Sequence, residues 1–242
     1  MNEYYNNTEV YPGSDSDGLN RYIAKVFGWM FLGLFLTAAS TFAIVYGIGV
    51  SPAFAQAISA MQQFILIVFL LQVVLVGFIS VRVQKMNTPT AISLYILYAV
   101  MNGFTIGLFA FMFAGSVVVS AFAITAISFG VMAVYGITAK QDLTKMGNLF
   151  RMGVLGLIIM SVVNIFLGSS PMEFLICLIG LVLFLGLTAY DTQKIKAFYY
   201  GTEATGDVRM ASNLAVFGAL MLYLDFINLF MFILRLLTGG RR

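Results

Sequence analysis

Apolar residues fill seven long stretches of this chain, and polar and charged residues gather mainly in the breaks between them. A helix needs about 20 mostly apolar residues to cross a bilayer. Backbone groups inside the bilayer must bond internally, which favours helices. The pattern therefore predicts seven transmembrane helices. Their approximate ranges are 26–47, 64–81 (or starting earlier, near Ala53), 91–113, 117–137, 149–167, 172–190 and 213–237.

The breaks between the predicted helices are short, as at 115–116 and 168–171. Short connections favour antiparallel neighbours packed as helical hairpins. Residues 1–20 differ from the rest, since they are polar and acidic and include Pro12 and Gly13. We expect this segment to be a disordered tail ahead of a transmembrane domain over 21–242. The predicted fold class is an all-α polytopic membrane protein.

Composition strengthens this prediction, because the chain is 61% hydrophobic and 10% charged, whereas a soluble domain carries about 25% charged residues. The chain has no histidine, which excludes Ser–His–Asp triads and histidine-ligated zinc. Its one cysteine, Cys177, lies in an apolar stretch and is expected to be a packing residue. The net charge of +3 comes without a basic run, so no nucleic-acid partner is expected.

Basic residues mark one side of the predicted bundle, and three of the loops carry none. The positive-inside rule then places the N terminus in the cytoplasm and, with seven spans, the C terminus outside. Arg235, Arg241 and Arg242 conflict with this arrangement, and a re-entrant last segment is the alternative. The basic residues that set the orientation are Arg21, Lys25, Arg82, Lys85, Lys140, Lys145, Arg151, Lys194, Lys196 and Arg209.

Asp225 is the most unusual residue, because it lies deep in the last apolar stretch. A charged carboxylate at the centre of a spanning helix costs about 2.5–3.5 kcal/mol on insertion scales, and such acids mark functional sites by default. Asn228, three residues later, shares its helix face and is a supporting polar group. A structural carboxylate that is neutralised by a proton or a partner is the alternative.

A second acid, Asp191, falls at the end of the predicted sixth span. Lys194 follows it on the same helix face, so an ordinary ion pair at a helix end is an alternative to a functional role. These boundaries put Asp191 and Asp225 at depths that differ by about 15 Å. The two acids meet only if the sixth helix continues past Lys196.

Two carboxylates that meet in a low dielectric cannot both ionise cheaply, so they are expected to share one proton. Raising the pH removes that proton and favours repulsion or a bound cation. Calcium prefers oxygen ligands such as these, so a calcium path and a proton relay both fit. Arg82 and Lys85 are candidate basic partners, although they serve equally well as topology-setting charges.

Weaker polar signals accompany the acids. Gln72, Asn102, Thr105 and Asn164 lie inside apolar stretches and are expected to hydrogen-bond between helices. Glu173 lies near the outer end of the sixth span, where a solvated helix cap is expected.

The segments GLTAYDTQKIK (186–196) and LYLDFINLF (222–230) resemble the Bax inhibitor-1 family, most closely its bacterial inner-membrane members. The resemblance extends over about residues 21–235. It implies a seven-helix fold with a central last helix and a pH-sensitive calcium leak. It also implies that Asp191 and Asp225 form a di-aspartyl sensor, latched by a basic residue at the inner end of the second span. Arg82 or Lys85 fills that position here.

Three functions follow as hypotheses. The first is a calcium or proton path in the bilayer, with Asp191 and Asp225 as transient calcium ligands and no resident cofactor. The second is a regulatory protein that binds a membrane protease, as the resemblance to some bacterial relatives implies. The third, an aspartic intramembrane protease, needs a proton-sharing dyad, but the residues around the two acids disfavour it. We therefore expect no enzyme activity.

Overall fold

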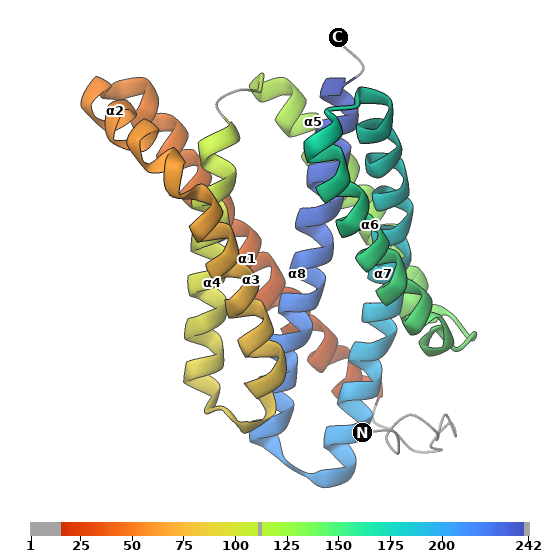
Figure 1. Cartoon of the computed structure of the whole chain (residues 1–242). Helices are drawn as coiled ribbons and strands as arrows, with labels where there is room; N and C mark the ends of the chain where they lie inside the picture. The colour runs from red at the N-terminus through yellow and green to blue at the C-terminus, as the bar shows by residue number, and fades with distance from the viewer. Residues whose placement is uncertain (1–15, 111–112, 240–242) are drawn as a thin grey trace.

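Long apolar runs form helices throughout residues 16–110 and 113–239, the part of the chain described by the computed structural model (Figure 1). No strand occurs within these residues. The helices are α1 (Ser16–Val50), α2 (Pro52–Met61), α3 (Ile65–Arg82), α4 (Thr88–Ala110), α5 (Gly115–Thr138), α6 (Gly147–Leu167), α7 (Ser170–Thr205) and α8 (Val208–Gly239). Three short 3₁₀ segments join them: η2 (Gln62–Phe64), η3 (Val83–Lys85) and η4 (Leu143–Met146).

All helices except α2 are long and apolar enough to cross a membrane, which confirms the all-α class and the seven predicted spans. The early start considered near Ala53 is instead the separate helix α2, which ends before α3 begins. Residues 1–15 of the predicted tail lie outside the described residues, and residues 16–20 already belong to α1. Arg241 and Arg242 are also outside the described residues.

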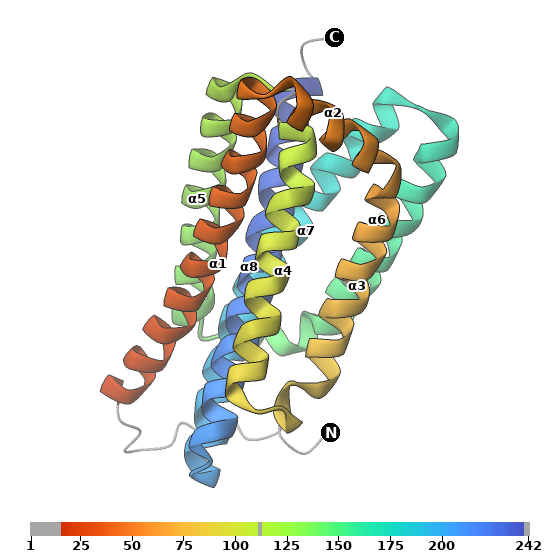
Figure 2. The same ribbon diagram turned by 90° about the vertical axis from the view of Figure 1, so that its left-hand side faces the viewer.

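Helix α8 is the most buried span. In its apolar window 67% of the residues are buried, against 39% or less in every other spanning helix. It packs against α1, α4, α5 and α7, and Figure 2 shows it running alongside α1 and α4. The remaining spans are peripheral, since α3 packs mainly on α4 and α6 mainly on α7.

The peripheral helices expose large apolar side chains such as Leu66 and Val74 on α3 and Ile159 and Phe166 on α6. In a soluble protein a surface of this kind would favour aggregation. On a spanning helix it contacts acyl chains. The described surface therefore fits an integral membrane protein.

The predicted charge asymmetry has a structural counterpart. The start of α1, the α3–α4 turn, the α5–α6 turn and the α7–α8 turn all lie at one end of the bundle (Figure 1). These segments carry the basic residues named above, whereas Arg235 lies near the opposite end, where α8 finishes.

Helix α7 is longer than the sequence predicts. The predicted span ends at residue 190, but the helix continues to Thr205. The polar extension stays helical because one face packs inward, with Thr192, Ile195 and Thr202 buried. The helix ends at Gly206, whose positive φ of 65° is open to glycine at no steric cost.

Candidate functional site

Asp225 lies near the middle of α8, about 26 Å from its start and about 21 Å from its end at 1.5 Å per residue. Its side chain is buried, with 4% exposure. Its Oδ2 atom accepts no hydrogen bond from any described residue. Buried polar atoms without partners are rare and need an explanation, such as a functional role or an ion. Asp225 is therefore the centre of the candidate site.

Asp191 reaches the same region because α7 and α8 form an antiparallel hairpin around Gly206. Asp191 lies about 23 Å along α7 from this turn, and Asp225 about 29 Å along α8. The depth difference is thus about 6 Å, and the predicted difference of about 15 Å is wrong. Its cause was the early end assigned to the sixth helix. The two acids therefore lie at similar depth on adjacent antiparallel helices, and the charge on Asp191 disfavours a second charge on Asp225.

The surroundings of the pair are apolar on the α5 side. The Phe226 ring lies 5.5 Å from the Phe122 ring and 5.5 Å from the Phe129 ring, between centroids. On α7 the buried hydroxyls of Thr188 and Thr192 donate to carbonyls of their own helix, at 2.8 Å and 2.6 Å. These hydroxyl protons are therefore not available to stabilise a charged carboxylate.

Lys194 is the nearest basic residue to Asp191 in sequence, and its charge acts on the Asp191 carboxyl. Its Nζ lies 5.9 Å from the Tyr190 ring centroid and 5.8 Å from that of Phe198. A direct ion pair between Asp191 and Lys194 was an alternative that the sequence left open. Among the described residues Lys194 makes these cation–π contacts and no such ion pair. Lys194 thus attracts Asp191 without neutralising it by contact.

Asn228 does not bond to either acid. It is half-buried on the next turn of α8, and its Nδ2 donates to the Leu224 carbonyl at 2.8 Å. Its amide proton therefore supports its own helix. Within the described part of the chain, no hydrogen bond between Asn228 and Asp225 supports the predicted role of Asn228.

Arg82 and Lys85 lie exposed at the end of α3 and in η3. This segment is held against the start of α8, because Asn213 Nδ2 donates to the Val83 carbonyl at 3.0 Å and the Met86 carbonyl at 2.8 Å. Asn213 is about 18 Å along α8 from Asp225. Within the described residues no hydrogen bond or ion pair joins Arg82 or Lys85 to the acids, so the structure does not bring these parts of the predicted site together.

Comparison with known proteins agrees with this architecture. The profile of the family described as "Inhibitor of apoptosis-promoting Bax1" matches residues 19–242. The chain belongs to the Bax inhibitor-1 family.

Three bacterial relatives illustrate the range of this similarity. The chain is 38% identical to inner membrane protein YbhL of Escherichia coli (strain K12), over 96% of this chain and 99% of the relative. It is 39% identical to uncharacterized protein RP147 of Rickettsia prowazekii, over 93% and 92%. It is also 39% identical to an uncharacterized protein of Borreliella burgdorferi, over 92% and 93%. This chain is accordingly an integral membrane protein with bacterial inner-membrane relatives.

Sequence reasoning missed two buried polar residues of α8. Asn213 was taken as a span boundary, although it is fully buried and its Oδ1 has no partner among the described residues. Tyr223 was not among the candidate residues, yet its hydroxyl lies in a buried hydrogen-bond cluster. The available signal was that both are polar groups within a predicted transmembrane span.

The weaker polar predictions have mixed outcomes. Gln72 donates to Thr105 at 2.8 Å, between α3 and α4, and Asn102 donates to Tyr223 at 3.0 Å, between α4 and α8. The prediction for Asn164 is wrong, because its Oδ1 accepts from the Ser169 backbone at 3.1 Å and closes the local turn. Glu173 is exposed in the first turn of α7, and Cys177 is buried and free, both as expected.

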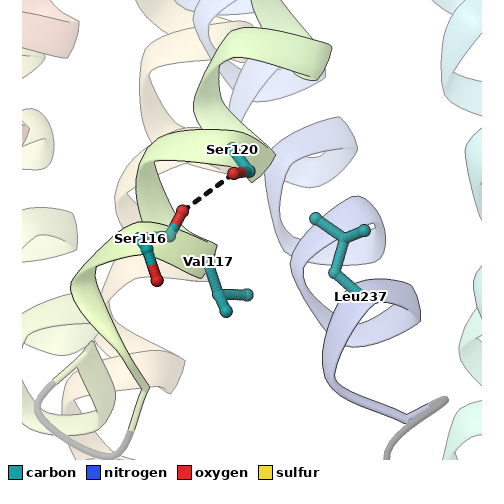
Figure 3. Close-up of a pocket in the computed structure, with 4 residues that line it drawn as sticks. All are labelled: Ser116, Val117, Ser120 and Leu237. Atoms are coloured by element: carbon teal, nitrogen blue, oxygen red, sulfur yellow. Dashed lines mark hydrogen bonds between the residues drawn. The ribbon is translucent and has the colours of Figure 1, made fainter.

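A small cavity of about 180 Å³ lies away from the acids, between the start of α5 and the end of α8. Figure 3 shows its lining residues, Ser116, Val117, Ser120 and Leu237. Ser120 donates to the Ser116 carbonyl at 2.8 Å. Leu237 is about 18 Å along α8 from Asp225, so this cavity is not part of the candidate site.

A resident metal centre is not indicated by the side chains. The described residues contain no group of three or more His, Cys, Asp or Glu side chains that could hold a metal ion. Two carboxyls alone supply too few ligands for calcium, which takes six to eight oxygens. Any cation held by Asp191 and Asp225 would need water and carbonyl oxygens as well, which suits transient binding.

Proposed function

We propose that this protein is a passive, pH-sensitive path for calcium across the inner membrane, gated by protonation of Asp191 and Asp225. The observation that carries the proposal is the buried Asp225 carboxyl. It lies at mid-span with an unpartnered Oδ2 and within electrostatic range of Asp191. An acid buried only for packing would be expected to have its oxygens satisfied.

The proton shared by Asp191 and Asp225 controls whether the path is closed or open. One proton shared by the two carboxyls keeps the pair singly charged and lets α7 and α8 pack closely. Loss of that proton as the pH rises leaves two negative charges. Unit charges about 4 Å apart repel by about 4 kcal/mol at an effective dielectric constant of about 20. An interhelical hydrogen bond in a membrane protein contributes about 0.6 kcal/mol. The repulsion therefore outweighs several such bonds and favours separation of α7 from α8.

Calcium is the cation that this chemistry favours. The freed carboxylates offer hard oxygen ligands, and the opened interface admits the water that completes the coordination shell. With two acids and few other fixed ligands, binding is weak enough for release. The latch implied by the family resemblance stays a prediction, because it requires Arg82 or Lys85 to move toward the acids.

The proposal is tested with purified protein in liposomes that contain a calcium-sensitive dye. We expect the calcium flux of the natural protein to rise as the pH is raised from about 5 to about 8. Asp191→Asn and Asp225→Asn remove the titrating groups, so the double variant should show only background, pH-independent flux. Glu173→Gln is the matched control, since Glu173 is an exposed acid on the same helix as Asp191. A double variant with the natural pH dependence would refute the gate.

A second candidate function is regulation of a membrane protease or another membrane partner. It is favoured by the length of the α7–α8 hairpin. Helix α7 spans 36 residues, about 54 Å, whereas the hydrocarbon core is about 30 Å thick. Exposed residues at the tip, including Glu203 and Val208, are therefore accessible to a partner.

Cross-linking from the tip separates the two functions. Substituting Glu203 and Val208 should remove a specific cross-linked partner while calcium flux in liposomes persists. Loss of flux without loss of the partner would favour the path alone. We further propose that the protein is not an enzyme, and cleavage of a transmembrane peptide that depends on Asp225 would overturn this.

A further inference from the structure

A second buried polar cluster lies on the side of α8 opposite the acids. Tyr223 is fully buried, and its hydroxyl lies 2.7 Å from Thr37 Oγ1 on α1 and 3.0 Å from Asn102 Nδ2 on α4. The rings of Tyr95 and Tyr98 pack edge-on against the Tyr223 ring, with centroids 6.0 Å and 5.9 Å away. Tyr223 thus joins three helices at one point.

Proton counting fixes the direction of these bonds. Asn102 Nδ2 has only protons to offer, so the Tyr223 oxygen accepts from it. The Tyr223 hydroxyl proton is then free to be donated to Thr37 Oγ1. The single Thr37 proton remains for the carbonyl of Gly33 or Ala99, at 2.9 Å and 3.0 Å. Each hydroxyl proton has an acceptor, as a buried network requires.

Helices α1 and α4 form a close unit to which this cluster attaches α8. Thr41 Oγ1 donates to the Gly103 carbonyl at 2.9 Å, one turn beyond the Thr37 contact. A Cβ atom added at Gly103 would overlap the Thr37 carbonyl oxygen, so the backbones approach as closely as glycine allows. The Tyr223 hydroxyl is therefore fixed by a rigid pair of helices.

The position of Tyr223 on α8 connects this anchor to the acids. Residues two apart on a helix point about 200° apart, so Tyr223 faces α1 and α4 while Asp225 faces α7. We propose that Tyr223 is a positioning residue whose bonds to Thr37 and Asn102 fix the rotation of α8 about its axis and keep the Asp225 carboxyl directed at Asp191. The transport readout of this inference rests on the proposed function, and its structural readout does not.

Few ionisable groups other than Asp191 face Asp225 from the elements packed against α8. The segments of α1 around Thr37 carry none, and the ionisable residue of α5 is Tyr135, whose ring is exposed. If a Tyr223 variant changes the titration of Asp225, the position of the Asp225 carboxyl relative to the ionisable residues of α7 has therefore changed. The ionisable residues on the facing parts of α7 and α4 are Asp191, Lys194, Lys196, Tyr95 and Tyr98.

The inference is tested by following the infrared band of the protonated Asp225 carboxyl as a function of pH in liposomes, with the band assigned by its loss in Asp225→Asn. Tyr223→Phe removes the hydroxyl and should shift the titration midpoint by about half a pH unit or more. The matched control is Tyr95→Phe, since Tyr95 is equally buried but its hydroxyl donates to the Trp29 carbonyl on α1 at 2.8 Å, and not to a residue of α8. Phenylalanine keeps the ring that packs against Tyr223, so this control should leave the midpoint unchanged.

A second variant separates positioning from stability. Tyr223→Phe with Asn102→Leu also removes the amide that Tyr223→Phe leaves unpaired, so it should recover thermal stability while keeping the shifted midpoint. A natural titration profile in this double variant, or the same profile for Tyr223→Phe and Tyr95→Phe, would overturn the inference.

Calcium flux distinguishes failure of the inference from failure of the proposed function. A shifted carboxyl midpoint in a protein that shows no pH-dependent flux would refute the path and support the positioning role. Normal pH-dependent flux in Tyr223→Phe with an unshifted carboxyl midpoint would support the path and refute the positioning role.

Discussion

Two side-chain oxygens of α8 are buried without a hydrogen-bond partner among the described residues, Asn213 Oδ1 and Asp225 Oδ2. They differ in what the rest of the side chain does. Asn213 is neutral, and its Nδ2 protons bind the Val83 and Met86 carbonyls in the connection between α3 and α4. Asp225 is ionisable and has an acid as its neighbour. Asn213 therefore holds α8 against the connection between α3 and α4, whereas Asp225 is suited to gaining and losing a proton.

We expect Asn213→Leu to lower the free energy of unfolding by about 1–2 kcal/mol, because two interhelical hydrogen bonds are lost from a buried site. Denaturation in mixed detergent micelles measures this change. Asn228→Leu is the control on the same helix, since Asn228 bonds only to the Leu224 carbonyl of α8. An equal loss in both variants would show that the α3 contact contributes nothing specific.

At the scale of elements, α5 approaches α7 closely at Gly136 and Ala189, two residues before Asp191. A Cβ atom on Gly136 would overlap the Ala189 carbonyl oxygen. About two turns further along α7 than Ala189, Lys196 Nζ donates to the Ile137 carbonyl at 2.7 Å, near the C-terminal end of α5. A cation at a helix C terminus is favoured by the helix dipole. These contacts hold the polar half of α7 against α5.

Gly136→Ala should therefore destabilise the protein by about 1–3 kcal/mol, the usual cost of overpacking. Gly130→Ala on the same helix should be neutral or slightly stabilising, because Gly130 has open space around it and alanine is the better helix former. Thermal melting in detergent compares the two. Equal melting temperatures would mean that α5 shifts away from α7 without cost.

The loop between α5 and α6 contains an exposed acid whose pKa responds to its local bonds. The Thr144 side chain donates to Asp142 and, with the backbone N–H at 2.9 Å, lowers the Asp142 pKa below its usual value. A lowered carboxyl pKa contributes stability above the unfolded-state pKa and loses it as the pH falls through the folded-state pKa. The contribution is therefore present at neutral pH and is lost only at acidic pH, below the range proposed for the gate.

At the scale of the whole molecule, seven spans place the two ends of the bundle on opposite sides of the membrane. The basic turns lie together at one end, and the positive-inside rule predicts that this end faces the cytoplasm. Arg235 is the single basic residue at the other end among the described residues and does not offset the three basic turns.

Cysteine labelling tests this orientation. In a Cys177→Ala background, Ser170→Cys and Ala204→Cys place exposed thiols at the two ends of α7. An impermeant maleimide should label position 170 in intact cells and position 204 only after permeabilisation. Labelling in the opposite order would invert the topology, and labelling of both positions from one side would contradict α7 as a span.

Sequence alone was sufficient to predict the seven spans and to select the two acids as candidates, because long apolar stretches and isolated carboxylates are local signals. It was insufficient for the depth of Asp191, because the extension of α7 beyond Tyr190 is polar on average and is held by packing of Thr192, Ile195 and Thr202. The Tyr223 cluster joins residues as far apart as Thr37 and Asn102. A partnership of that kind depends on tertiary structure and has no local signature.

The continuous hairpin of α7 and α8 has a consequence for biogenesis. Asp191 and Asp225 are on consecutive spans joined by the tight turn at Gly206, so they are synthesised and inserted one directly after the other. Once the hairpin closes, Asp225 is buried among the helices and Asp191 lies at a similar depth on the adjacent helix. Both carboxyls can thus enter the membrane together, as parts of one helical hairpin. By then the first five spans have been synthesised, and the hairpin can pack against them.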